Sequence, residues 1–177
     1  MTVLIVGGAS SGKSAYGEAL ISRLAQGRRK IYLATMAAED LESQRRIARH
    51  RLSRRGKGFW TVECPVDLAS APVPEGGGVL LECLGNLCAN ELYTARNPGA
   101  EENIFRGFLR LRSRCEQTVI VSNEVFTGGS DYAGDTLAFL RLLANLNRRI
   151  AALADGVCEV CCGVPVYYKG GDLFGHL

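Results

Sequence analysis

Several features are scarce or missing in this chain of 177 residues. No apolar run approaches the roughly 18 residues that a membrane-spanning helix needs, so we expect no membrane span. The first residues lack a basic segment and a cleavage pattern, so we expect no signal peptide. The net charge of +3 is too small to indicate nucleic-acid binding, and we expect no nucleic-acid partner. Neither a repeat nor a low-complexity linker divides the chain, which favours a single domain over residues 1–177.

The seven cysteines are an odd number, and their scattered spacing does not form a disulfide framework. Because no export signal is expected, we interpret them as reduced thiols in the cytoplasm. Cys158, Cys161 and Cys162 form a C-x-x-C-C pattern, which can indicate a metal site. However, no second Cys or His pair follows at zinc-finger spacing, and the run 157–164 is typical of a core strand. We therefore interpret these three residues as buried free thiols.

Short apolar runs alternate along the chain with longer stretches of helical periodicity. The runs that favour strands are Val3–Val6, Ile31–Ala34, Val79–Leu81, Thr118–Ser122, Cys158–Cys162 and Val166–Lys169. The stretches that favour helices are Lys13–Gln26, Glu39–Arg55, Leu84–Tyr93, Glu101–Cys115 and Asp135–Ala154. Continuous apolar strands are typical of sheets that are buried on both faces. This alternation predicts an α/β fold with a mostly parallel sheet and helices on both faces.

The segment between the first strand and the first helix matches the pattern G-x-x-x-x-G-K-[ST] at every fixed position. Its residues are Gly7, Gly8, Ala9, Ser10, Ser11, Gly12, Lys13 and Ser14. Small residues let backbone N–H groups converge on phosphate oxygens at the positive end of a helix. Lys13 can reach the β- and γ-phosphates, and the Ser14 hydroxyl can bind Mg²⁺. The motif and its context predict a phosphate-binding loop, or P-loop, for a nucleoside triphosphate rather than a simple glycine-rich turn.

A P-loop needs a carboxylate for the Mg²⁺ shell, and the carboxyl end of a neighbouring parallel strand is the expected place for it. Glu82 and Glu124 both follow apolar runs, and Glu82 is our first candidate. The alternative is that Glu82 only interacts with the dipole of the helix that follows. The guanine-reading pattern Asn-Lys-x-Asp of switch GTPases is absent from the sequence. Its absence weakens a Ras-like interpretation without excluding GTP.

The segment 45–55 is dense in arginine and contains His50, one of two histidines in the chain. One interpretation is a solvated helix face. A second is contact with nucleic acid, but no aromatic residue interleaves with the arginines to stack on bases. A third places His50 at a nucleotide, with Arg46 and Arg54 one helical turn to either side. Neighbouring cations lower an imidazole pKa, and an unprotonated imidazole can attack an α-phosphoryl group.

Further segments follow the P-loop in a characteristic order. They are Tyr32–Thr35, Arg46–Arg51, Trp60–Cys64, Leu80–Leu84, Val121–Val125 and Leu146–Ala151. Together with the P-loop they cover nearly the whole chain. In this order they resemble the bifunctional adenosylcobinamide kinase / adenosylcobinamide-phosphate guanylyltransferase family of cobalamin biosynthesis. A P-loop alone is shared by many folds, whereas a His-bearing helix followed by Thr-x-Glu-Cys, Leu-Glu-Cys and Ser-Asn-Glu-Val is far more specific.

The resemblance implies two activities. One transfers a phosphoryl group from ATP or GTP to the hydroxyl of adenosylcobinamide, and the other transfers GMP from GTP to the resulting phosphate. It implies that His50 carries GMP covalently, that Lys13 takes part in catalysis, and that Arg46, Glu63 and Glu82 bind the nucleotide. It also implies a RecA-like P-loop NTPase fold, with Mg²⁺ at Ser14 and Glu82. The expected assembly is a homotrimer, with the site near a subunit interface.

The sequence departs from the family pattern at two places. The segment 126–132 lacks a proline that many members have, which leaves the corrinoid contacts of this loop unassigned. Arg49 stands where members often carry a second histidine. Two other functions also fit the P-loop. The chain could be a kinase of another small metabolite, with His50 incidental, or a nucleotide-binding switch or assembly NTPase that acts through partners.

Overall fold

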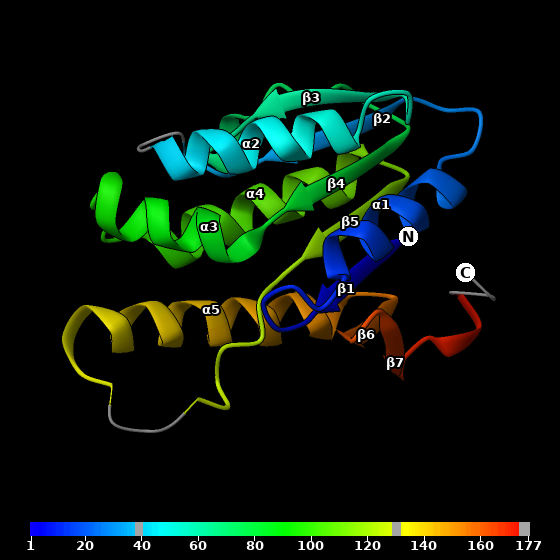
Figure 1. Ribbon diagram of the computed structural model, residues 1–177. Coiled ribbons are helices and arrows are strands. Elements are labelled where there is room, and N and C mark those ends of the chain that lie inside the picture. The colour runs from blue at the N-terminus through cyan, green and yellow to red at the C-terminus, as the bar shows by residue number, and fades with distance from the viewer. Residues whose placement is uncertain (38–40, 129–131, 174–177) are drawn as a thin grey trace.

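The computed structural model describes residues 1–37, 41–128 and 132–173 (Figure 1). Within the helix over residues 41–53 and at the end of the chain, seven side chains lie outside this description: Glu42, Ser43, Arg46, Arg49, His50, Ser53 and Leu173.

A seven-stranded sheet with the strand order β3-β2-β4-β5-β1-β6-β7 forms the centre of the molecule. The strands are β1 (Thr2–Val6), β2 (Lys30–Ala34), β3 (Phe59–Glu63), β4 (Gly78–Glu82), β5 (Gln117–Val121), β6 (Gly156–Cys161) and β7 (Val164–Lys169). The first six run parallel, and β7 pairs antiparallel with β6. The carboxyl ends of β1, β2, β4, β5 and β6 therefore meet at one edge, where parallel sheets bind ligands.

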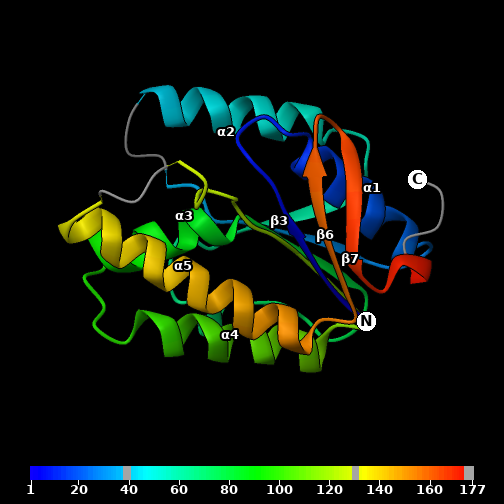
Figure 2. The same cartoon turned by 90° about the horizontal axis from the view of Figure 1, so that it is seen from below.

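Helices cover both faces of the sheet (Figure 2). They are α1 (Lys13–Leu24), α2 (Leu41–Ser53), α3 (Leu84–Ala89), α4 (Ala100–Arg114) and α5 (Gly134–Leu153). One turn of π-helix (Asn90–Thr94) extends α3, and short 3₁₀ turns lie at Leu68–Ser70 and Gly171–Leu173. The helices α1 and α2 lie on one side of the sheet, and α3, α4 and α5 on the other. Among the described residues, none of the helices is both long and apolar enough to cross a bilayer.

The two layers of helices correspond to two apolar cores. Within β1, Leu4 packs into the core beneath α3, α4 and α5, whereas Val3 and Ile5 pack into the core beneath α1. Successive side chains of a strand point to opposite faces, so both sets are buried and the strand is apolar throughout. The expected α/β architecture with a mostly parallel sheet is confirmed.

Most strands and helices lie within two residues of their expected bounds, and the larger differences are at β3 and at the helix after β4. The structure adds β3 at one edge of the sheet, where Trp60 is exposed and the strand lacks a continuous apolar run. The helix expected over Leu84–Tyr93 ends its regular part at Ala89. The helix expected over Glu39–Arg55 is described from Leu41 to Ser53, and its expected start at Glu39 lies outside the described residues.

The cysteine interpretation is right for Cys158, which is fully buried, and wrong for Cys161 and Cys162, which are exposed. The physical reason is local. The strand β6 ends at Cys161, and a turn with Cys162 and Gly163 at positive φ angles leads directly into β7. Cys161 is therefore the last residue of its strand, and Cys162 already lies in the exposed turn.

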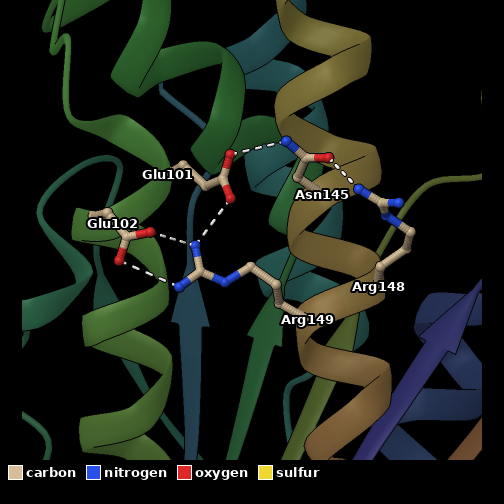
Figure 3. Close-up of polar contacts among 5 residues, drawn as sticks. All are labelled: Glu101, Glu102, Asn145, Arg148 and Arg149. Carbon is tan, nitrogen blue, oxygen red and sulfur yellow. Dashed lines mark hydrogen bonds and ion pairs between the residues drawn. The ribbon is translucent and has the colours of Figure 1, made fainter.

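A cluster of charged side chains holds α4 and α5 together (Figure 3). The Arg149 guanidinium from α5 lies 2.9 Å from Glu101 and 2.5 Å from Glu102, and it stacks 3.8 Å above the ring of Phe105. Asn145 donates a hydrogen bond to Glu101 as well. The cluster fixes the position of α5 on α4.

One further contact ties α5 to the sheet. Asn147, in the same helix, accepts a hydrogen bond of 2.7 Å from the buried hydroxyl of Ser122, just beyond the end of β5. The helix α5 therefore supports the strand end beside the P-loop.

Candidate functional site

The P-loop lies at the carboxyl edge of the sheet, between β1 and α1, as the motif predicts. Gly12 immediately precedes α1 with φ at 93°, a conformation that glycine adopts without strain. A Cβ atom on Gly7 would lie 2.7 Å from the carbonyl oxygen of Val160, and one on Gly12 would lie 3.2 Å from the Cα of Gly163. The end of β6 therefore presses against the loop, and this close approach requires glycine at both positions. Figure 2 shows the dark-blue loop beside the turn that joins β6 to β7.

Two side chains at the start of α1 face the predicted phosphate position. Lys13 is buried, and its Nζ donates a hydrogen bond of 2.9 Å to the carbonyl oxygen of Gly8. The Ser14 hydroxyl donates a hydrogen bond of 2.7 Å to Oε1 of Glu82. The structure thus brings together the lysine, the hydroxyl and the strand-end carboxylate, although Ser14 and Glu82 are 68 positions apart in the chain.

Glu82 lies in an unusual electrostatic environment at the end of β4. Its Oε2 atom is buried and has no hydrogen-bond partner among the described residues. Burial raises the pKa of Glu82 to about 7, although the hydrogen bond from Ser14 and the charges of Lys13 and Arg54 act to lower it. A buried carboxylate with a spare oxygen is suited to a cation that would replace the missing partner.

The alternative carboxylate, Glu124, is placed differently. Its backbone N–H donates to the carbonyl oxygen of Gly7, so its main chain lies at the P-loop. Its carboxylate, however, accepts hydrogen bonds from the N–H of Phe126 and the hydroxyl of Thr127. Because the carboxylate of Glu124 is used by its own loop, the geometry favours Glu82 as the partner of Ser14.

The oxygens of Ser14 and Glu82 fit Mg²⁺, which prefers hard oxygen ligands. Within the described ranges, no group of three or more His, Cys, Asp or Glu side chains could hold a metal alone. Mg²⁺ is normally bound by one or two protein oxygens together with substrate phosphates and water. The donor set therefore fits a cation that arrives with a nucleotide.

A groove runs from Glu82 to the helix α2. Its inner part is a narrow cavity of about 40 Å³ between the strand ends and α2, lined by Tyr32, Ala34, Met36, Ile47, Arg54, Glu63, Glu82 and Asn86. Its outer part is a wider hollow of about 440 Å³ that shares Met36, Ile47 and Glu63 with the inner part. Glu63, at the end of β3, accepts a hydrogen bond of 2.5 Å from Arg51 on α2. The predicted nucleotide residues Glu63 and Glu82 thus line the same groove.

Arg54 is a candidate site residue that the sequence indicated only as a neighbour of His50. It is 7% exposed, and its guanidinium stacks 3.6 Å from the ring of Tyr32. Two of its nitrogens, Nε and NH1, are buried and have no hydrogen-bond partner in the described part of the chain. A buried cation without such partners is costly in a stable core. It is therefore a strong candidate for binding an anion.

Arg46 and His50, two of the predicted site residues, lie on α2. Their side chains are outside the described residues. The helix nevertheless contributes Ile47 to the lining of the inner cavity, which Glu82 lines as well. The roles predicted for Arg46 and His50 stay predictions.

The parallel sheet and the loop between β1 and α1 are those of P-loop nucleotide-binding proteins, so the chain belongs to this class of fold. It is similar to the flagellar accessory protein FlaH from Methanocaldococcus jannaschii, with a TM-score of 0.50 and 13% identity over 99% of this chain and 80% of that one. It is also similar to a KaiC-like protein from Pyrococcus horikoshii, with a TM-score of 0.50 and 14% identity over 89% of this chain and 71% of that one. At such identities the likeness shows the fold alone.

The family follows from sequence comparison. Residues 3–168 match the family model described as cobinamide kinase / cobinamide phosphate guanyltransferase, and the chain belongs to this family. It is 32% identical to the bifunctional adenosylcobalamin biosynthesis protein CobU of Salmonella typhimurium, over 96% of this chain and all of that protein. It is also 32% identical to CobP of Pseudomonas aeruginosa, over 98% of this chain and all of that protein.

Proposed function

We propose that this protein phosphorylates adenosylcobinamide with ATP or GTP and then transfers GMP from GTP to adenosylcobinamide phosphate through a covalent intermediate on His50. Membership of the family supports the two activities. The main support for the site is the hydrogen bond from Ser14 to Glu82, whose second carboxylate oxygen has no partner among the described residues. Glu82 lies at the inner end of a groove that residues of α2 also line. The groove runs from Glu82, which accepts the hydrogen bond from Ser14, to the helix that bears His50.

In the kinase step, the hydroxyl oxygen of adenosylcobinamide attacks the γ-phosphorus of the nucleotide. A new P–O bond forms, the bond to the β–γ bridging oxygen breaks, the hydroxyl proton passes to solvent, and the nucleoside diphosphate leaves. Backbone N–H groups of the P-loop and the ammonium group of Lys13 stabilise the charge on the phosphate oxygens. Mg²⁺, held by Ser14 and Glu82, would supply further neutralisation of the phosphate charge.

In the guanylyl step, an unprotonated nitrogen of His50 attacks the α-phosphorus of GTP. A P–N bond forms, the bond to the α–β bridging oxygen breaks, and pyrophosphate leaves. The phosphate oxygen of adenosylcobinamide phosphate then attacks the same phosphorus, which breaks the P–N bond and releases His50. The product is adenosylcobinamide-GDP. We assign the buried guanidinium of Arg54 to the polyphosphate, because two of its donors need an acceptor.

The direct test is to incubate the protein with GTP labelled on the α-phosphate and to separate it on a denaturing gel. We expect an acid-labile, alkali-stable label on the wild-type chain and none on His50→Ala. GTP labelled on the γ-phosphate should leave no label, because that phosphate departs with pyrophosphate. The absence of an α-phosphate label on the wild type would refute the covalent intermediate and leave a plain P-loop kinase as the better description.

The chain offers a matched control, because it contains only two histidines. His176→Ala should retain the label in full. Phosphorylation of adenosylcobinamide, followed separately with nucleotide labelled on the γ-phosphate, tests the kinase half. We expect this activity to survive in His50→Ala and to be lost in Lys13→Ala. Failure of the chain to phosphorylate the corrinoid would favour another small metabolite as acceptor.

We also propose that the protein works in the cytoplasm as a homotrimer, as the family resemblance implies. The seven cysteines are all free, which supports a reducing compartment. Light scattering measures the assembly directly. A mass of three chains of 19.1 kDa would support the trimer, and a monomer mass would refute it.

A further inference from the structure

Two adjacent thiols are exposed beside the P-loop. Cys161 ends β6 and Cys162 begins the turn to β7, and both side chains are exposed, whereas the other five cysteines are buried. The Cys161 thiol donates a hydrogen bond to the Cys162 sulfur, which raises the pKa of Cys161. The two sulfur atoms therefore already lie side by side. Neither residue has a part in the proposed phosphoryl transfers.

The turn that carries these thiols is bonded to the P-loop. The backbone N–H of Gly163, the next residue, donates a hydrogen bond of 2.8 Å to the carbonyl oxygen of Ser11. The Cα of Gly163 lies 3.2 Å from the position of a Cβ on Gly12. Val160, one residue before the pair, presses its carbonyl oxygen against Gly7. A change in the backbone at the dithiol is therefore transmitted directly to the loop that binds phosphate.

The chemistry of two neighbouring thiols favours one class of ligand. A disulfide normally joins residues whose Cα atoms are 4.4–6.8 Å apart, whereas adjacent residues are about 3.8 Å apart. A direct S–S bond here would therefore be strained. A single thiophilic atom inserted between the sulfurs lengthens the bridge and removes this constraint. Soft, thiol-binding elements that accept two sulfur ligands meet the requirement.

We propose that Cys161 and Cys162 form a dithiol site for trivalent arsenicals, and that its occupation weakens nucleotide binding at the P-loop. With phenylarsine oxide as the probe, both thiols condense with one arsenic atom. Two As–S bonds form, the As–O bond breaks, and the two thiol protons leave with that oxygen as one water molecule. No oxidant or reductant is required. The bridged pair fixes the turn in a new conformation and displaces the N–H of Gly163 from Ser11.

The test measures arsenical binding and nucleotide binding on the same preparation. Mass spectrometry of the native protein should show one phenylarsenic group per chain. This group should be removed by a dithiol such as dimercaptopropanol but not by an equal concentration of a monothiol. The affinity for a fluorescent GTP analogue should fall about fivefold, as expected for the loss of one backbone hydrogen bond. By reciprocity, saturating GTP should weaken arsenical binding by the same factor.

The variants separate this site from the other thiols. Cys161→Ser and Cys162→Ser should each abolish the monothiol-resistant capture and the effect on GTP affinity, whereas Cys115→Ala, at a buried and distant thiol, should retain both. Capture that persists in the serine variants would overturn the site, and capture without any change in GTP affinity would overturn the coupling. GTP protection in the wild type tests the coupling without any variant. Loss of the His50 label leaves the site standing, because the test reads only arsenical stoichiometry and GTP binding.

Discussion

Glu82→Gln preserves the shape of the side chain and an oxygen that accepts the hydrogen bond from Ser14, but it removes the charge that titrates. In the folded protein the pKa of Glu82 is raised from 4.5 to about 7, mainly by burial. A cation shared with a nucleotide requires the ionised form. Nucleotide binding in the presence of Mg²⁺ should therefore strengthen as the pH rises through 7.

The magnitude follows from the pKa. The ionised fraction of a group with a pKa of about 7 rises about tenfold between pH 6 and pH 8, so affinity for the Mg²⁺ complex of GTP should rise by the same factor. The terminal phosphate of a nucleotide also loses a proton, at about pH 6. In the Glu82→Gln variant, only the nucleotide phosphate should still contribute to the pH dependence of GTP affinity. The difference between the two pH profiles isolates Glu82.

Isothermal titration calorimetry with a non-hydrolysable GTP analogue, at several pH values and with and without Mg²⁺, measures this difference. The variant should show a flatter profile and a smaller gain from Mg²⁺. Parallel profiles for the wild type and the variant, with equal gains from Mg²⁺, would refute the assignment of Glu82 to the cation.

The same shift predicts how the stability of the nucleotide-free protein depends on pH. Between pH 4.5 and about 7 the folded state binds more protons at Glu82 than the unfolded state does. The free energy of unfolding should therefore fall as the pH rises through this window, by about 3 kcal/mol at most. Urea denaturation should show the fall in the wild type and a reduced fall in Glu82→Gln. An equal fall in both proteins would place its cause elsewhere.

Three further changes test other parts of the structure. Lys13→Ala should weaken nucleotide binding by about 10- to 100-fold. Lys169→Ala should not, because Lys169 lies at the amino ends of the parallel strands, away from the P-loop. Equal losses in the two variants would point to a general effect of charge. Arg54→Met should weaken nucleotide binding in calorimetry. It should not lower the thermal unfolding midpoint, because it removes a buried charge that lacks hydrogen-bond partners. A large fall in the midpoint would instead reveal a structural role for Arg54. Arg149→Ala should reduce the free energy of unfolding, measured in urea, by about 1 kcal/mol, because its ion pairs are partly exposed. Nucleotide binding should be unchanged, and a loss of binding would link α5 to the site.

The sequence by itself determined the elements whose signals are local. The P-loop could be identified because its residues are contiguous in the sequence. The buried parallel strands could be identified because short, continuous apolar runs are typical of them. The strand β3 could not be identified in this way. It lies at an edge of the sheet, Trp60 within it is 53% exposed, and it becomes a strand by pairing with β2. Edge strands depend on their neighbours, and their sequences carry a weaker pattern.

Only the tertiary structure decided which distant residues meet. It brought the carboxylate of Glu82 to the hydroxyl of Ser14, and it buried Arg54 against Tyr32 in the same groove. It also ended β6 at Cys161, so that two cysteines expected in the core face solvent beside the P-loop. Burial, pKa and contact depend on how strands and helices meet in space, and a linear pattern records only which residues are available to meet.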